Sequence, residues 1–121
     1  MSVRQLQELA QSSFCTIGAH TVNHAALAAH SRAYQTDELQ ENKRFLEEIT
    51  GQKVNHLACP YGNYNEDTFY AAADLHFYAG FTTETKTIKP NQHPYGLGRF
   101  QVKNLNGTDF QDQLSKWENN L

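Results

Sequence analysis

Apolar positions that recur three and four residues apart predict four helices along the chain. In the longest of them the apolar face stops just before Gly51, and glycine commonly follows the last turn of a helix. Thr36 precedes the same pattern and is the expected N-cap, because a threonine side chain can accept a hydrogen bond from a helix N–H group. The predicted helices are residues 3–12, the stretch from Thr36 to Gly51, residues 65–75 with Asn65 as the cap, and the stretch from Thr108 or Asp109 to Trp117.

Short runs of β-prone apolar residues, bounded by glycine or proline, predict four strands between these helices. They cover residues 14–17, 54–59, 78–83 and 98–102, and the stretch 20–30 is expected to be a loop followed by a helical turn. Strands that are apolar throughout and alternate with helices indicate a parallel sheet covered by helices. A closed barrel of this kind needs about eight strands. The pattern therefore predicts one α/β domain over residues 1–121, either a small open sheet or part of a barrel.

The charge and cysteine content narrow the classes of protein that fit. Ten Lys and Arg oppose 13 Asp and Glu, for a formal charge of −3, whereas nucleic-acid and anionic-membrane surfaces need clustered basic residues. No apolar run approaches the ~20 residues of a membrane span. Cys15 and Cys59 lack the Cys-x-x-Cys spacing that would favour a redox domain, and they are too few for a disulfide-rich scaffold. Two small buried thiols are expected.

Two histidines, His20 and His24, follow the first predicted strand. If this segment turns helically, their side chains share one face and can bind one metal ion. Zinc accepts imidazole ligands and keeps a position open for water at catalytic sites, and Thr21 between the histidines can fix the loop by bonding the backbone. The spacing alone is a weak signal, and two surface histidines are the alternative. The unclustered histidines, for which a surface or hydrogen-bonded role is expected, are His30, His56, His76 and His93.

A second motif, Cys59-Pro60-Tyr61-Gly62, ends the second predicted strand. Parallel α/β folds place their functional sites at the carboxyl ends of strands. Pro60 and Gly62 favour an unusual turn that can aim the Tyr61 backbone N–H into such a site. By itself, Pro-Tyr-Gly is also typical of an ordinary turn.

In their order and separation these motifs resemble the polysaccharide deacetylase family, also called carbohydrate esterase family 4 or the NodB homology domain. The segment Ile17–His24 carries the family's His-[Ser/Thr]-x-x-His pattern, and the turn Cys59–Gly62 follows it. Tyr78–Thr83 and Leu97–Phe100 also have counterparts, so the resemblance covers about residues 3–103. It implies a partial (β/α) barrel of the polysaccharide deacetylase type, with about four parallel strands and flanking helices.

The resemblance also implies an activity. Family members are metal-dependent hydrolases that remove acetyl groups from the N-acetylglucosamine units of a polysaccharide or oligosaccharide, and they are often secreted, periplasmic or at the cell surface. His20 and His24 correspond to the family's metal-binding histidines, so zinc or another divalent transition metal is the expected cofactor. The Tyr61 backbone N–H corresponds to the family's oxyanion donor, which stabilises charge in the tetrahedral intermediate.

Three further positions are expected at the site on the same basis. Arg99 lies near the position of a family arginine that orients the catalytic aspartate, which makes Tyr61 and Arg99 the expected catalytic residues. Asn23 and Pro60, together with Tyr61, are expected to contact substrate.

The departures from the family pattern are equally specific. The family motif Thr-Phe-Asp-Asp-Gly, which supplies the general base and a third metal ligand, does not occur, and Cys59 replaces a family tyrosine. His93 lies in a loop that does not match the motif of the general acid. The chain is therefore expected to be the central and C-terminal part of a deacetylase domain. The alternative is a non-catalytic domain that folds, oligomerises and binds at most metal or glycan.

A sheet without its amino-terminal strands has unpaired backbone groups at its edge. The sequence therefore predicts self-association into a homo-oligomer through the strand at residues 14–17, or a need for the absent amino-terminal part.

Overall fold

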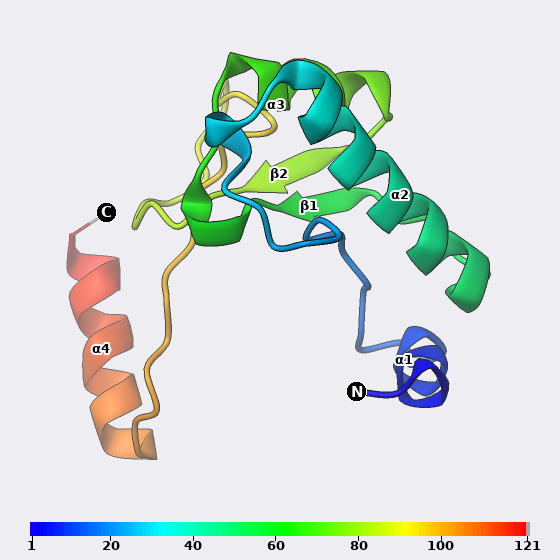
Figure 1. Cartoon of the computed structure of the whole chain (residues 1–121). Helices are drawn as coiled ribbons and strands as arrows, with labels where there is room; N and C mark the ends of the chain where they lie inside the picture. Colours follow the sequence, from blue (N-terminus) through cyan, green and yellow to red (C-terminus); the bar gives the residue numbers. More distant parts are fainter. Residues whose placement is uncertain (121) are drawn as a thin grey trace.

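The computed structural model describes residues 1–120 and consists of a short parallel sheet with helices on both of its sides (Figure 1). The helices are α1 (Val3–Ala10), α2 (Arg32–Thr50), α3 (Glu66–Asp74) and α4 (Gly107–Asn119). The strands are β1 (His56–Ala58) and β2 (Ala79–Phe81), and single turns of 3-10 helix are η1 (Leu27–Ala29) and η2 (Pro60–Gly62).

The sheet is parallel, as the apolar strands predicted. Strands β1 and β2 pair in register, with Leu57 opposite Gly80. One further segment joins on each side through a single parallel bridge, from Ala19 to Leu57 and from Leu97 to Phe81. Four parallel segments therefore lie side by side, but the outer two are much shorter than the sequence indicated.

The predicted strand at residues 14–17 is wrong. Phe14 is 100% exposed, and the chain first joins the sheet at Ala19, whose N–H donates to the His56 carbonyl and whose carbonyl accepts from the Ala58 N–H. Gly18 lets the backbone approach β1 closely, because a Cβ at that position would crowd the His56 carbonyl oxygen at 3.2 Å. The chain therefore pairs with β1 just after this glycine, and not at the preceding residues with high β propensity.

The predicted strand at residues 98–102 is also wrong. Leu97 makes the bridge, and the chain beyond it then follows the loop after β2, with the Arg99 N–H donating to the Glu84 carbonyl at 2.9 Å. Gly98 packs so closely on this loop that a Cβ there would lie 2.5 Å from the Lys86 carbonyl oxygen. The Arg99 N–H is thus bonded to the loop and not to a neighbouring strand, and the parallel pairing ends at Leu97.

Two helix starts differ from prediction, and the ends of α1 and α4, at Ala10 and Asn119, each differ by two residues. Helix α2 begins five residues earlier than Thr36 implied, because Ser31 caps it and accepts from the Tyr34 N–H. The Thr36 hydroxyl instead donates to the Arg32 carbonyl within the helix. Helix α4 is capped by Asn106, not by Thr108 or Asp109. The cap of α3 at Asn65 and the left-handed Gly51 that ends α2 are both confirmed.

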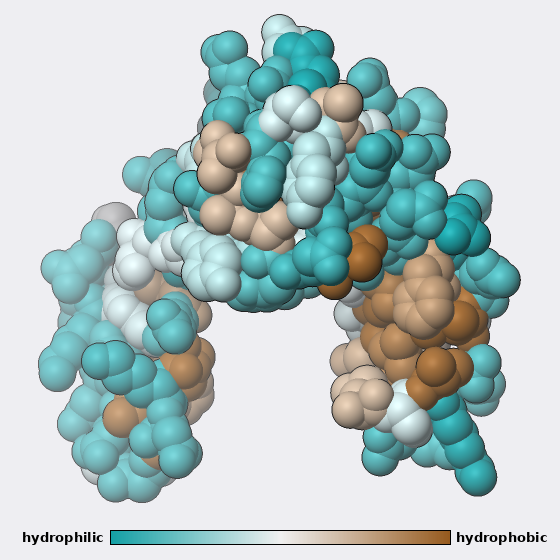
Figure 2. All heavy atoms as spheres, in the orientation of Figure 1, coloured by the Kyte–Doolittle hydropathy of each residue, from teal (hydrophilic) through white to brown (hydrophobic). Residues whose placement is uncertain are grey.

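Helices α2 and α3 cover one side of the sheet, whereas α1 and α4 lie toward the other side and apart from each other (Figure 1). The core lies between the sheet and the two covering helices. It is made of Ala19, Leu27, Leu39, Val54, Leu57, Cys59, Ala71, Ala72 and Phe77. Brown, hydrophobic residues also gather over α1 and its surroundings (Figure 2). None of the helices in residues 1–120 combines the length and apolar character needed to cross a membrane.

Candidate active site

The residues expected at the site come together because their segments are parallel. His20 directly follows the bridge residue Ala19, the turn η2 begins two residues after β1, and Arg99 lies two residues after the bridge residue Leu97. The carboxyl ends of parallel strands meet at one edge of a sheet, which is where α/β folds hold their functional groups. The topology therefore gathers these positions at one edge.

The two histidine rings lie against each other, as the sequence predicted. The centroids of His20 and His24 are 4.8 Å apart with the ring planes at 66°, and the Tyr61 ring lies 4.7 Å from His24. The segment between them does not turn helically, because Thr21 and His24 have φ values of 64° and 54°, and the helical turn expected within residues 20–30 comes later, at η1. An irregular loop with two left-handed residues makes the rings adjacent, and such residues are seldom tolerated without strong local support.

Part of that support comes from inside the loop. The Thr21 side chain is buried, and its hydroxyl oxygen accepts a hydrogen bond from the Ala25 N–H at 3.3 Å. This confirms that Thr21 fixes the loop by bonding the backbone.

The orientation of His20 suits a metal ligand. Its Nδ1 lies 2.7 Å from the Ala58 carbonyl oxygen, and because a carbonyl oxygen only accepts, Nδ1 must carry the proton. This tautomer leaves a lone pair on Nε2, and histidines that bind metals commonly have their other ring nitrogen held in this way. The backbone N–H of His20 donates to Asn42 Oδ1 at 2.9 Å, which fixes the residue from α2 as well.

Two imidazoles are thus suited to a divalent metal ion. Within residues 1–120, no arrangement of three or more His, Cys, Asp or Glu side chains could enclose such an ion. The roles of His20 and His24 as metal ligands stay predictions.

Glu38 of α2 is the principal anchor of the histidine loop, and the sequence analysis missed it. Its side chain is only 5% exposed. One carboxylate oxygen accepts from the backbone N–H groups of Val22 and Asn23 at 3.0 and 2.8 Å, and the other accepts from the Asn23 side-chain amide. Burial by itself raises the pKa of Glu38, but the hydrogen bonds from Asn23 and Val22 outweigh it and lower the pKa. The group is therefore a charged carboxylate at neutral pH.

A signal for this anchor was present in the helix pattern. Gln35, Glu38 and Leu39 all lie on the buried face of α2, at spacings of three and four residues. Polar side chains at buried helix positions require partners, since burial without a hydrogen bond is costly. The partners of Glu38 lie in the loop that carries the histidines, whereas Gln35 bonds to the His30 carbonyl and to residues at the start of α3. Because the Asn23 amide is bound to Glu38, contact of Asn23 with substrate stays a prediction.

The turn η2 has the unusual geometry expected of it. Tyr61 and Gly62 have φ values of 59° and 62°, and a Cβ on Gly62 would lie 2.1 Å from the Thr83 hydroxyl oxygen. Glycine is therefore required there both by the backbone conformation and by the contact with Thr83. Pro60 is buried, whereas the Tyr61 side chain is 70% exposed beside His24. The proposed roles of Pro60 and Tyr61 toward substrate, and of the Tyr61 N–H toward an oxyanion, stay predictions.

Arg99 is held at the carboxyl end of β2. Its Nε donates to the Thr82 carbonyl at 2.8 Å, and among residues 1–120 it forms no ion pair with a carboxylate. Its role in orienting an aspartate stays a prediction.

The cysteines give no support to a redox site. Both are free, Cys59 is buried and Cys15 is half-buried. Burial raises the pKa of Cys59 to about 11, although the positive charge of Arg99 acts in the opposite direction. A thiol with this pKa is protonated at neutral pH and is a poor nucleophile.

The family model described as polysaccharide deacetylase matches residues 2–80. The fold and the arrangement at the strand ends agree with this match, and the chain belongs to the polysaccharide deacetylase family.

Individual relatives support the same assignment. The chain is 29% identical over 111 residues to YxkH of Bacillus subtilis, a protein provisionally named a polysaccharide deacetylase. This alignment covers 91% of the chain and 39% of YxkH. The chain is also 23% identical over 126 residues to the poly-beta-1,6-N-acetyl-D-glucosamine N-deacetylase of Staphylococcus epidermidis, in an alignment that covers 98% of the chain and 43% of that enzyme. The solved structure of the Streptococcus pyogenes deacetylase PplD in complex with acetate superposes on the chain with a TM-score of 0.85 at 28% identity. The superposition covers 95% of this chain and 50% of PplD.

The chain thus spans about two fifths of the curated relatives and half of the solved one. The structural neighbours are (β/α) barrel deacetylase domains, and this chain forms a partial α/β portion of that fold. The fold class predicted from the sequence is confirmed.

Proposed function

We propose that this chain is part of a metal-dependent polysaccharide N-deacetylase that hydrolyses the acetamide of N-acetylglucosamine-type sugars. The observation that carries the proposal is the His20–His24 pair, with Nδ1 of His20 bonded to the Ala58 carbonyl. This bond leaves the lone pair on Nε2 free to bind a metal ion. Membership of the polysaccharide deacetylase family supplies the reaction class.

Each residue at the site has a proposed role. His20 and His24 would hold a zinc ion or another divalent transition metal, which when bound supplies Lewis-acid chemistry for amide hydrolysis. The Tyr61 N–H donates to the oxygen on which charge develops, and the left-handed turn directs this group. The exposed Tyr61 ring and the Asn23 side chain border the substrate. Arg99 supplies positive charge at the neighbouring strand end, where it is positioned to orient a carboxylate.

A non-catalytic role is the second candidate. The available metal ligands favour this role, because residues 1–120 place no carboxylate beside the two imidazoles to complete a metal site. In that case the chain binds metal or glycan without hydrolysing it. If the chain is catalytic, the general base and the third ligand come from a second copy or from other polypeptide.

The test combines metal analysis with an acetate-release assay. The purified chain is loaded with zinc, dialysed, analysed for bound metal, and incubated with N-acetylated chitooligosaccharides. His20→Ala and His24→Ala are compared with His30→Ala, which removes an exposed histidine whose ring stacks on Tyr34 and not on the pair. We expect metal retention that is lost in the first two variants and kept in the third.

The outcomes separate the two candidates. Acetate release that depends on both histidines supports the deacetylase, whereas metal retention without acetate release supports the non-catalytic role. Metal retention that survives in both alanine variants overturns the assigned site.

A further inference from the structure

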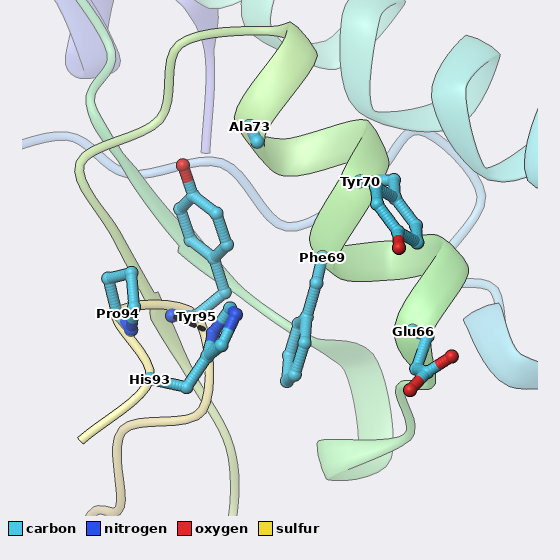
Figure 3. A pocket seen from close by; sticks show the side chains of 7 residues that line it. All are labelled: Glu66, Phe69, Tyr70, Ala73, His93, Pro94 and Tyr95. Atoms are coloured by element: carbon cyan, nitrogen blue, oxygen red, sulfur yellow. Dashed lines mark hydrogen bonds between the residues drawn. The ribbon is translucent and has the colours of Figure 1, made fainter.

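A cavity separate from the candidate active site lies between α3 and the loop that leads to Leu97. Its volume is about 580 Å³. The lining residues are Glu66, Phe69, Tyr70, Ala73, His93, Pro94 and Tyr95 (Figure 3). None of them belongs to the candidate active site, and we call this cavity the α3 pocket.

Aromatic rings form the walls of the α3 pocket and are held in place by their neighbours. The Phe69 and His93 rings stack with centroids 4.0 Å apart and planes at 14°, and Tyr64 stacks on Phe69 at 5.2 Å. The Tyr95 hydroxyl donates to the Phe77 carbonyl at 2.8 Å, and the Tyr95 N–H donates to His93 Nδ1. The walls are therefore preformed, so a ligand would lose little affinity to ordering them.

One carboxylate stands at the edge of this aromatic surface. Glu66 is exposed and forms no ion pair with the described cations. Arg32 lies 4.3 Å from the centre of the Tyr70 ring and covers one face of it. Arg32 already donates to Asp67 at 2.7 Å, so its charge is compensated. The α3 pocket therefore offers an aromatic lining and one exposed carboxylate that no side-chain cation among residues 1–120 pairs with.

We propose that the α3 pocket binds a de-N-acetylated hexosamine unit, the cationic product of the proposed function, on which this inference rests. The apolar C–H face of the sugar packs on the aromatic wall, and its ammonium group pairs with the Glu66 carboxylate at the edge of that wall. Hydrogen bonds between an ammonium group and a carboxylate are stronger than those between neutral groups. The N-acetylated unit keeps the same ring but lacks the charge, so the pocket distinguishes product from substrate by charge.

Such a pocket gives a polymeric ligand a second point of attachment. Once a deacetylated unit is held on α3, the rest of the same polysaccharide remains at a high effective concentration near the protein. The pocket thereby favours chains that already contain amino sugars over fully acetylated chains.

The experiment measures binding of the glucosamine trimer to the metal-free chain by calorimetry, at low salt and slightly acidic pH, with the N-acetylglucosamine trimer as the neutral comparison. We expect tighter binding of the glucosamine trimer, weakened about twofold to fivefold by Glu66→Gln, as for an exposed ion pair. Tyr70→Ala should also weaken binding, because Tyr70 is one of the aromatic residues that line the pocket. Glu118→Gln, the same change in net charge on the remote helix α4, should leave the affinity unchanged.

A double variant, His20→Ala with His24→Ala, makes failure of this inference distinguishable from failure of the proposed function. If the double variant abolishes binding while Glu66→Gln does not, the sugar occupies the active site and the α3 pocket is not its site. Equal affinity for both trimers, or equal loss in Glu66→Gln and Glu118→Gln, also overturns the inference. Binding uses no metal and no catalysis, so a negative acetate-release assay leaves its result unaffected.

Discussion

Glu38 offers the sharpest test of how the histidine loop is held. Its carboxylate accepts three hydrogen bonds from Val22 and Asn23 while only 5% exposed. A hydrogen bond to a charged group contributes about 1.5–3 kcal/mol, and a buried polar group left without a partner costs about 1–3 kcal/mol. In Glu38→Gln one amide oxygen can still accept, but the new NH₂ group faces donors. We therefore expect the free energy of unfolding to fall by about 2–4 kcal/mol.

The assay is urea unfolding followed by circular dichroism, with Glu41→Gln as the control. Glu41 lies on the same helix but is exposed and pairs only with Arg44. Its replacement should leave the unfolding midpoint almost unchanged, because surface ion pairs are screened by water and salt.

The pH dependence gives an independent check of the same reasoning. The folded-state pKa of Glu38 is lowered, so the carboxylate stabilises the fold above its unfolded pKa of about 4.3, and this stabilisation is lost as pH falls through the folded pKa. The difference between wild type and Glu38→Gln should be largest near neutral pH and should shrink below about pH 4. A difference below about 1 kcal/mol at pH 7, or one that stays constant down to pH 3, would refute the proposed anchoring.

Three further predictions follow from the fold. Gly62→Ala should lower the unfolding midpoint in urea and disturb the Tyr61 turn, because its Cβ would lie 2.1 Å from the Thr83 hydroxyl; a midpoint equal to that of wild type would contradict the close contact. Leu57→Ala should cost about 2–5 kcal/mol in urea unfolding, because Leu57 is fully buried in the central strand, and a loss below about 1 kcal/mol would show that the core is not closely packed. The chain should also self-associate, since unpaired sheet edges and exposed apolar side chains such as Phe14 favour pairing. Light scattering at micromolar concentration tests this, and a stable 13.8 kDa monomer would rule it out.

Several features of this protein were determined by local sequence. Helix α3 begins at Asn65 and helix α2 ends at Gly51, as predicted, because capping depends on hydrogen bonds and backbone conformations within a few residues. The turn at Pro60-Tyr61-Gly62 was predictable for the same reason. The order of apolar strands and helices also determined that the sheet is parallel, since parallel neighbours need long crossover connections, which helices α2 and α3 supply on either side of β1.

Other features were decided only by tertiary structure, because they depend on residues far apart in the chain. The strand that was expected at residues 14–17 lies at Ala19, where the backbone can approach His56 closely enough to pair. His20 obtains its tautomer from the Ala58 carbonyl, 38 residues away, and the loop around it depends on Glu38 of α2. A sequence pattern reports which side chains prefer burial, but pairing and hydrogen bonding between distant segments arise only when the whole chain packs. The histidine motif can therefore be recognised in the sequence, whereas the contacts that orient it form only when the chain folds.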